Sequence, residues 1–319
     1  MRSAEESGTV PAVVTPGNYD GVHLGHRALV STARRVADQS GTPMKVVALT
    51  FDPHPLHFMA SDRAPPLLTT VEHRIALLRD AGADEVVVQR FDRPFSLLSP
   101  AGFVEEILLR RLAAQAVVVG SDFRFGAKRG GDVALLGSLG AQHGFDVTTV
   151  PPVTLDGELV SSSHVRAALV KGEIERATRM LTRVHQLERR VLQGDQRGRT
   201  IGFPTANLEL SGLLAPADGV YAVSARILDP EGGLSDARLS GVANLGVRPT
   251  VSGGRSMEVH LLDFAGDLYG RTLRIGFVKR LRGEIKFPDL AALRAQIARD
   301  VEAGRAALEA CDARLLAWI

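Results

Sequence analysis

Cysteine is nearly absent from this chain, because Cys311 is the single cysteine among 319 residues. One thiol cannot form an intramolecular disulfide framework or a cysteine-based zinc site. Disulfides are rare in a reducing cytosol, so this cysteine content is typical of a cytoplasmic protein. We therefore expect a cytoplasmic location.

Long apolar runs and a secretion signal are also missing. No stretch of about 18 or more apolar residues occurs, so the sequence predicts no membrane-spanning helix. The opening residues MRSAEESGTVPAVVT lack the basic and then apolar segments of a signal peptide. We expect a soluble protein that does not act on a membrane.

Neither sign of charge dominates: 38 Lys and Arg face 36 Asp and Glu, a formal charge of +2. Such a balance does not favour nucleic acid as a partner. The sequence also contains no GxxxxGK[ST] motif, which excludes a P-loop kinase. Any anionic ligand must be held by local geometry, and we expect small molecules as partners. Nothing in the sequence indicates an oligomeric state.

The first half of the chain alternates apolar runs with helical segments. The runs are rich in β-branched residues and are continuous, as in strands buried on both faces of a parallel sheet. They cover residues 12–15, 45–51, 84–91, 116–120 and 145–150. Thr69 with Glu72 forms a capping-box pattern, and Ser99 before Pro100 marks another helix start. Repeated strand–helix units predict a Rossmann-like, doubly wound α/β domain with ligands at the carboxyl ends of its strands.

The second half has a different rhythm. Residues 219–228, 258–264 and 272–281 show partial period-two alternation between glycine-containing turns, which predicts an antiparallel β-barrel or sandwich. A terminal helix follows Asp289, and we expect its buried face to contain Leu290, Leu293, Ile297 and Val301. The change of rhythm places the domain boundary between residues 1–183 and 184–319.

A first candidate site is the stretch GNYDGVHLGH, residues 17–26, between the first apolar run and the next helix. The N-terminus of a helix offers unpaired N–H groups to an anion, and Gly21 and Gly25 allow the backbone to approach a phosphate. His23 and His26 can donate hydrogen bonds to phosphate oxygens. Two alternatives stay open. One is a zinc site with His54 and His57, although the spacing is unusual for zinc; the other is a loop whose histidines bond to backbone.

A second candidate site lies in VSSSHVRAAL, residues 160–169. Ser161 and Ser162 at a helix start, followed by Arg166, form a second possible phosphate cradle. The alternative is a serine N-cap beside a solvated arginine.

A third candidate site lies in GDQRGRTIGFPTANL, residues 194–208. Thr205 and Asn207 are two residues apart on an extended segment, so their side chains project to the same face. Both offer hard oxygen ligands of the kind that Mg²⁺ accepts beside phosphates and water. A turn in which Asn207 bonds its own backbone is the alternative.

These motifs together resemble one family. GNYDGVHLGH resembles the HxGH signature of nucleotidyltransferases, and TFDPHP (50–55), VVVGSDFRFG (117–126) and VSSSHVR (160–166) follow in family order. GRTIGFPTANL (198–208), GVANLGVRPTV (241–251), MEVHLLDFAGDLYG (257–270) and LRGEIKF (281–287) resemble riboflavin kinase segments. The chain thus resembles the bifunctional riboflavin kinase/FMN adenylyltransferases, the prokaryotic FAD synthetases, over roughly residues 12–300.

For the first half, the resemblance implies an adenylyltransferase that joins AMP from ATP to FMN and releases pyrophosphate. His23, His26 and Arg166 would be its catalytic residues. Other residues that would bind the nucleotide are Gly17, Asn18, Tyr19, Gly25, Asp122, Ser161 and Ser162. The flavin would be bound by Phe51, Pro53, His54, Pro55 and Phe125.

For the second half, the resemblance implies a kinase that phosphorylates riboflavin with ATP. Glu258 would be the catalytic base, and Thr205 and Asn207 would bind Mg²⁺. The nucleotide would be bound by Arg199, Gly202 and Phe203. The flavin would be bound by Asn244, Arg248 and Arg282.

The chain departs from the family pattern near the boundary. Thr182 stands in place of a glycine, Val184 of a proline, His185 of an aromatic residue and Arg189 of a glycine. In the serine-rich motif, Ser163 keeps the hydroxyl of the usual threonine, and His164 replaces a frequent arginine. Two alternative functions follow. One is an adenylyltransferase with a silent kinase half, and the other is a flavin-binding regulator without catalysis.

Overall fold

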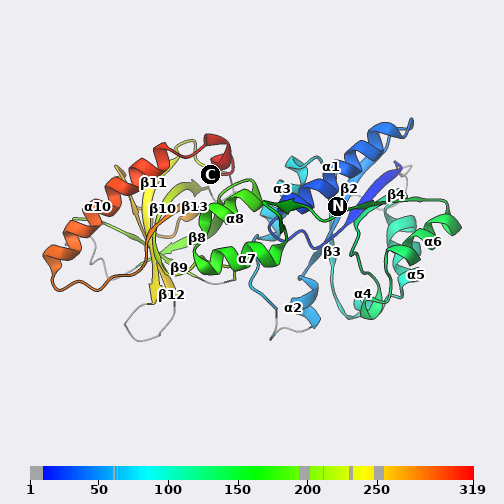
Figure 1. Ribbon diagram of the computed structural model, residues 1–319, viewed down its shortest axis with the longest axis horizontal. Coiled ribbons are helices and arrows are strands. Elements are labelled where there is room, and N and C mark those ends of the chain that lie inside the picture. Colours follow the sequence, from blue (N-terminus) through cyan, green and yellow to red (C-terminus); the bar gives the residue numbers. More distant parts are fainter. Residues whose placement is uncertain are drawn as a thin grey trace. The chain divides into compact units, whose positions relative to one another are not determined.

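The computed structural model describes residues 10–59, 62, 64–193, 202–210, 212–229, 233–247 and 255–319. Two compact units form (Figure 1). The first contains the chain up to Pro65 together with Thr70–Val160, and the second contains Pro66–Thr69 together with Ser161–Ile319. The expected functional boundary after residue 183 stays a prediction.

The first unit is built on a five-stranded parallel sheet in the order β3-β2-β1-β4-β5. All five strands match the apolar runs predicted from the sequence, which confirms the doubly wound α/β fold. The strands are β1 (Ala12–Pro16), β2 (Lys45–Asp52), β3 (Glu85–Arg90), β4 (Ala114–Gly120) and β5 (Asp146–Val150). The helices are α1 (Leu24–Gln39), α2 (Pro55–Met59), α3 (Val71–Asp80), α4 (Arg93–Ser96), α5 (Pro100–Gly102), the π-helix η2 (Phe103–Arg111), the short 3₁₀ turn η3 (Ala127–Arg129) and α6 (Val133–His143).

Helices cover both faces of the central strands (Figure 1). Val14 of β1 packs in one cluster with Leu108 of η2 and Leu136 of α6. Val13, whose side chain points to the other face of β1, is equally inaccessible to solvent. The prediction of burial on both faces is wrong for β3 and β5, which are partly exposed along their length because they form the two edges of the sheet.

Helix starts follow the predicted capping residues, with one shift. Ser99 caps the segment that begins at Pro100, and its Oγ accepts a hydrogen bond from Gly102 N at 3.0 Å. Helix α3 is capped by Thr70 rather than by Thr69, because the Thr70 hydroxyl is the one that accepts from His73 N, at 3.2 Å. The prediction of a capping box at Thr69 was therefore wrong by one residue.

The second unit is a closed antiparallel barrel in the order β10-β11-β12-β9-β8-β13, preceded by two helices. Of the two predicted architectures, the structure confirms the barrel, because β13 pairs with both β10 and β8. Its elements are α7 (Ser162–Lys171), α8 (Ile174–Leu181), β8 (His185–Leu192), β9 (Ala206–Glu209), β10 (Gly219–Leu228), β11 (Leu239–Val247), β12 (Arg255–Leu261), β13 (Thr272–Arg282), α10 (Leu290–Glu309) and the 3₁₀ turn η4 (Ala313–Leu316). A short hairpin, β6 (Thr154–Leu155) and β7 (Glu158–Leu159), precedes this unit in the chain.

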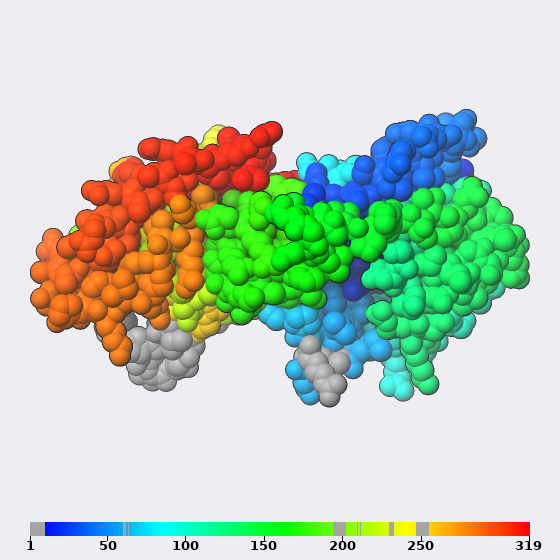
Figure 2. Space-filling model, viewed as in Figure 1, coloured from blue at the N-terminus to red at the C-terminus, as the bar shows by residue number. Residues whose placement is uncertain are grey.

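Helix α10 lies along the outside of the barrel (Figure 2). Asp289 caps it as predicted, with its Oδ1 accepting from Ala292 N at 2.8 Å. The expected buried face was partly wrong, because Leu290 is 56% exposed and the buried positions are Asp300 and Gly304. A Cβ at Gly304 would lie 2.8 Å from Val242 Cγ2, so the helix approaches the barrel most closely at this glycine.

The last residues of the chain pack against the barrel. Val184 N donates a hydrogen bond to Leu315 O at 3.1 Å, a bond that the family's proline at this position cannot make. The side chains of Val184, Leu316 and Ile319 form a small buried cluster. The departure from the family pattern at Val184 therefore coincides with docking of this C-terminal segment.

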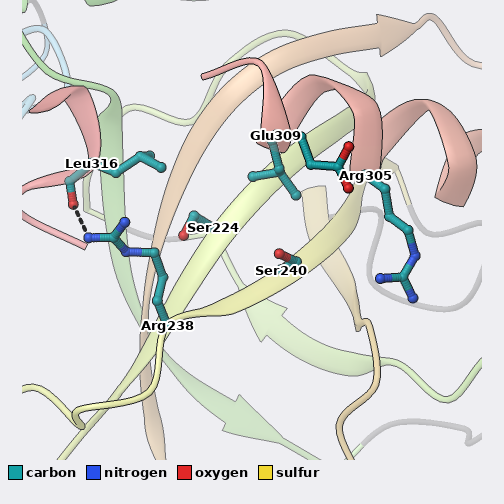
Figure 3. A pocket seen from close by; sticks show the side chains of 7 residues that line it. Ser224, Arg238, Ser240, Arg305, Glu309 and Leu316 are labelled. Atoms are coloured by element: carbon teal, nitrogen blue, oxygen red, sulfur yellow. Dashed lines mark hydrogen bonds between the residues drawn. The ribbon is translucent and has the colours of Figure 1, made fainter. Parts of the chain in front are cut away.

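A pocket of about 230 Å³ lies between the barrel, α10 and this segment (Figure 3). Its lining consists of Ser224, Arg238, Ser240, Arg305, Leu308, Glu309 and Leu316. Both arginines already have partners: Arg238 donates to Leu316 O at 3.2 Å, and Arg305 pairs with Asp263 at 2.8 Å. No residue predicted to bind substrate lines this pocket. Among the described residues, none of the helices combines the length and the apolar character that a membrane span requires.

Candidate active sites

In the first unit, the loop between β1 and α1 has an unusual backbone. Tyr19 and Val22 have φ values of 53° and 40°, and Gly21 has a φ of 85°. Positive φ is uncommon for residues with a side chain and is rare for a β-branched one. Strain of this kind persists where the surroundings fix the backbone, and it is frequent at ligand sites. The loop lies at the carboxyl end of β1, where a doubly wound sheet binds ligands.

The two predicted catalytic histidines lie together at the start of α1. Their rings stack with centroids 3.7 Å apart and an interplanar angle of 20°. His23 is the N-cap residue, but its side chain does not cap the helix. A Cβ at Gly25 would lie 3.1 Å from His23 Cε1, so glycine leaves room for this imidazole. The structure therefore brings His23, Gly25 and His26 together at a helix N-terminus, a geometry suited to an anion.

Tyr19, expected to line the nucleotide, has its side chain inside the protein. It is fully buried, and its hydroxyl donates to Thr15 O at 2.9 Å and lies 2.7 Å from Thr15 Oγ1. Burial raises the pKa of this hydroxyl well above its usual value. Its ring contacts His26 edge to face at a centroid distance of 5.1 Å. The tyrosine side chain therefore packs against His26, and a contact between Tyr19 and the nucleotide stays a prediction.

The other predicted nucleotide residues of this unit lie at neighbouring strand ends. Gly17 N donates to Leu49 O at 2.9 Å, which ties the loop to β2. Asn18 is exposed, and its backbone O accepts from Thr50 Oγ1 at 3.1 Å. Asp122 is exposed just beyond β4. The structure thus gathers these residues around β1, β2 and β4.

The predicted flavin residues divide between two loops. Phe51, the second-last residue of β2, lies beside Phe91 and Phe95, with ring centroid distances of 6.0 and 5.7 Å. Phe125 is buried in the core cluster that also contains Phe103. The exposed Pro53 and the half-buried Pro55 follow Phe51 along the chain. Aromatic rings therefore surround Phe51, whereas Phe125 belongs to the hydrophobic core.

The zinc alternative for the histidines has no support from geometry. Among the described residues, no three His, Cys, Asp or Glu side chains are placed to hold a metal ion. His54 is buried and its Nδ1 accepts from Leu56 N at 3.2 Å, while His57 Nε2 donates to Pro65 O at 2.9 Å. His54 and His57 therefore have structural partners of their own.

In the second unit, α7 begins at the predicted serine. Ser161 is the N-cap, and its Oγ accepts from His164 N at 3.3 Å and lies 2.8 Å from His164 Nδ1. Ser162 is the first residue of the helix. Arg166 Nε donates to Pro66 O at 2.9 Å. The expected hydroxyl and arginine groups are thus present, and Ser161 and Arg166 form hydrogen bonds within the protein.

The barrel register brings the predicted kinase residues together. Asn207 of β9 pairs directly with Glu258 of β12, and Glu258 pairs directly with Asn244 of β11. Residues directly opposite one another in antiparallel strands share a face and have Cβ atoms about 5 Å apart. Met257 and Val259 are fully buried inside the barrel, so Glu258 points outward between them. The three polar side chains therefore form one row on the outer face.

The segment before β9 is fastened to the same strand. His260 Nδ1 donates to Pro204 O at 2.8 Å, and its ring meets Phe203 edge to face at 5.5 Å. Gly202 has a φ of 88°, a conformation that favours glycine. Thr205 follows Pro204 and is half-buried. His260 therefore anchors the segment that carries Thr205, and it belongs to the outer face of Glu258 because it lies two residues further along β12.

Arg282, expected at the flavin, has a structural partner. Its guanidinium forms a two-point ion pair with Asp300 of α10, with Nη2 to Oδ2 at 2.7 Å and Nε to Oδ1 at 3.0 Å. The two side chains are only 18% and 6% exposed. Gln296 Nε2 also donates to Asp300, at 2.8 Å. A flavin contact by Arg282 stays a prediction, and its observed role is to join the end of β13 to α10.

Two predicted residues, Arg199 and Arg248, lie outside the described residues. Sequence reasoning missed His260 and Asp300. His260 lies in the motif of Glu258 but was given no role there, and Asp300 lies in none of the assigned motifs. A signal for Asp300 was present, since it is an acidic residue beside Val301 on the expected apolar face of the terminal helix.

Comparisons with known proteins match both halves of the chain. A family model described as FAD synthetase matches residues 5–164, and one described as riboflavin kinase matches residues 181–308. The bifunctional riboflavin kinase/FMN adenylyltransferase of Escherichia coli K12 is 43% identical over 289 residues, which is 90% of each chain. The protein of the same name from Pseudomonas fluorescens is 43% identical over 302 residues, or 92% of each chain.

A solved structure supports the fold over nearly the whole chain. A crystal structure described as a macrolide-efflux protein from Streptococcus pneumoniae is similar with a TM-score of 0.81 and 28% identity. The match covers 94% of this chain and 96% of that one. The order of motifs, the two folds and these relatives lead to one conclusion: the chain belongs to the bifunctional riboflavin kinase/FMN adenylyltransferase family.

Proposed function

We propose that this chain carries out both reactions of its family. The barrel half phosphorylates riboflavin to FMN with ATP, and the α/β half adenylates FMN to FAD with release of pyrophosphate. The observation that carries the proposal is the row of Asn207, Glu258 and Asn244 across three adjacent strands, because residues from distant motifs meet there. The stacked His23 and His26 at the start of α1 are its counterpart in the other half.

In the kinase reaction, Glu258 accepts the proton of the terminal ribityl hydroxyl of riboflavin. The resulting oxygen attacks the γ-phosphorus of ATP, and ADP leaves. Asn244, Arg248 and Arg282 contact the flavin. Arg199, Gly202 and Phe203 contact the nucleotide. These roles come from the family motifs and are supported by the half-buried position of Glu258 beside Asn207.

The residues at the kinase site fit Mg²⁺. The Asn207 amide and the Thr205 hydroxyl offer hard oxygens, and Mg²⁺ characteristically combines one or two such protein ligands with phosphates and water. When bound, Mg²⁺ would neutralise the negative charge of the ATP phosphates during transfer of the phosphoryl group. A site of this kind needs no cluster of three acidic or histidine side chains. It is therefore compatible with the described residues, among which no such cluster occurs.

In the adenylation, a phosphate oxygen of FMN attacks the α-phosphorus of ATP and pyrophosphate leaves. His23 and His26 donate hydrogen bonds to the phosphate oxygens as their charge grows, and Arg166 with Ser161 and Ser162 binds the pyrophosphate. The FMN phosphate is already a nucleophile, so no covalent enzyme intermediate is needed.

The remaining assignments complete this proposal. The residues that line the nucleotide are Gly17, Asn18, Tyr19, Gly25 and Asp122. The flavin wall consists of Phe51, Pro53, His54, Pro55 and Phe125. The functional domains are residues 1–183 and 184–319, and the location is the cytoplasm, which the single cysteine supports.

The test separates the two reactions in one protein. Purified wild type with ATP and Mg²⁺ should convert riboflavin to FMN and FAD, and both products should be absent without Mg²⁺. Glu258→Gln should lower FMN formation by roughly 100-fold or more and leave the adenylation of supplied FMN unchanged. His23→Ala should do the reverse. Product formation is measured by chromatography of the flavins.

Matched controls are Glu302→Gln on the exposed side of α10 and His143→Ala on α6, both of which should keep both activities. Folded wild type that forms neither product would overturn the proposal. Wild type that uses FMN but never riboflavin would support the adenylyltransferase alternative. Tight flavin binding without ATP consumption would support the regulator.

A further inference from the structure

The loop that carries the histidines needs an external support. Three of its residues, Tyr19, Gly21 and Val22, have positive φ, and two of them have side chains that disfavour it. A residue with a side chain keeps such a conformation only where neighbouring groups hold it. The groups that hold the loop therefore decide the shape of the phosphate site.

Arg74 is the largest fully buried side chain of the described chain, with an exposed fraction of 1%. It comes from α3, and its Nη1 donates to Phe51 O at 3.1 Å and to Thr50 Oγ1 at 3.2 Å. Both acceptors lie near the carboxyl end of β2. An arginine is seldom buried unless it is paired, so this one has a specific task.

Thr50 links Arg74 to the loop through hydrogen bonds. Its Oγ1, which accepts from Arg74, donates to Asn18 O at 3.1 Å. Asn18 directly precedes the first residue of positive φ. A chain of two hydrogen bonds thus runs from α3 through β2 to the strained part of the loop, within a single compact unit.

The charge of Arg74 is compensated inside the protein. Burial lowers the pKa of the guanidinium, and the nearby Asp20, Asp52 and Glu72 carboxylates counteract this by favouring its charged form. Asp20 belongs to the same loop and is itself only 1% exposed. Arg74 is therefore engaged with protein groups and acts on a ligand only through the loop.

We propose that Arg74 is a positioning residue for the adenylation: through Thr50 and Asn18 it holds residues 18–22 in the strained conformation that presents His23 and His26 to ATP. This inference rests on the proposed function of the first unit. It assigns a role to a residue outside the HxGH, serine-rich and flavin segments.

The test measures steady-state kinetics of FAD formation from FMN. Arg74→Met removes the charge and the donors at similar length, and it should raise the KM for ATP by about tenfold or more, with a smaller change in the KM for FMN. Arg74→Lys should recover part of the loss. Thr50→Val breaks the link to Asn18 while leaving the charge, and it should raise the KM for ATP by a few-fold.

Arg79→Met is the matched control, because it makes the same change on the exposed side of the same helix. Riboflavin phosphorylation by the same preparations shows that the rest of the chain is folded. A wild-type KM for ATP in Thr50→Val, or equal increases in both KM values in Arg74→Met, would overturn the inference. If Arg74→Met does not fold, Thr50→Val decides alone. Failure of the proposed function is distinct, since wild type would then make no FAD from FMN.

Discussion

His185 shows how a single substitution changes the chemistry of a core. It stands where the family has an aromatic residue, and it is buried at 3% exposure against Phe277, with a centroid distance of 6.2 Å. Its Nε2 donates to Leu214 O at 2.8 Å. Burial lowers the pKa of this histidine from 6.5 to about 4, and the nearby Arg183 and Arg189 act in the same direction.

This shift predicts acid sensitivity of the barrel unit. The folded state binds the His185 proton less readily than the unfolded state, so unfolding takes up a proton between the two pKa values. The contribution of neutral His185 to the free energy of unfolding is fully present above about pH 6.5. It is lost as the pH falls toward about 4, which lowers the free energy of unfolding by about 3 kcal/mol in total. The measurement is urea denaturation at several pH values, followed by the fluorescence of Trp318, the single tryptophan, which lies in this unit.

His185→Phe should flatten that dependence over the same pH range, since phenylalanine restores the aromatic residue and does not titrate. His164→Phe is a comparison, because this half-buried histidine lies outside the barrel on α7. An unchanged acid dependence in His185→Phe would contradict the assignment.

At the residue scale, the sequence predicts the chemical types of the site well. His23, His26, Asn207 and Glu258 follow from short motifs, because the spacing within a motif is local. The buried orientation of Tyr19 and the ion pair of Arg282 do not follow. Their partners, Thr15 and Asp300, are chosen by packing, which local spacing does not encode.

The end of helix α8 explains another departure from the family. Thr182 is the C-cap, with a φ of 60°, and glycine is the residue that adopts this left-handed conformation without a steric cost. The left-handed backbone at this position therefore explains why the family has glycine there. The Thr182 hydroxyl donates to Leu181 O at 2.6 Å, which offsets part of the strain.

Thr182→Gly should stabilise the barrel unit by about 1 kcal/mol, because a side chain costs about 1–2 kcal/mol at positive φ and glycine loses some of this through its larger unfolded-state entropy. The shift in the urea midpoint of Trp318 fluorescence measures it. Thr182→Ala keeps the Cβ and removes the hydroxyl, so it should not stabilise. Equal stability of the glycine and alanine variants would show that strain at this cap is not the cause.

At the element scale, periodicity predicts most strands and the terminal helix. Burial of the edge strands β3 and β5 was overestimated, because the sequence pattern does not reveal strand order. Barrel closure also depends on strand order, since it requires β13 to pair with β10 and β8 at large sequence separation. A short alternating pattern fits a barrel and a sandwich equally well.

At the scale of the whole molecule, the two compact units do not follow the order of the chain. Residues Pro66–Thr69 precede α3 in the sequence but belong to the second unit. There, Leu214 N donates to Leu67 O at 2.8 Å, and Arg166 reaches Pro66 O. The sequence could not indicate this crossing, because it consists of a few backbone contacts between distant residues.

The two reactions should be separable between molecules. Glu258→Gln and His23→Ala remove different steps, and FMN released by one molecule can diffuse to another. An equimolar mixture should therefore make FAD from riboflavin, although neither variant does so alone. Product analysis over time measures it, with each variant alone as a control. No FAD from the mixture, while each variant keeps its remaining activity, would argue that FMN must stay within one molecule.

The docked C-terminal segment has a practical consequence for handling the protein. Arg238 binds the carbonyls of Leu316 and Ile319, Arg274 binds that of Trp318, and the Ile319 side chain is fully enclosed. A purification tag fused after Ile319 would begin inside a packed surface and would compete with these anchors. A lower melting temperature after fusion of a tag behind Ile319 would measure how much these anchors stabilise the barrel unit.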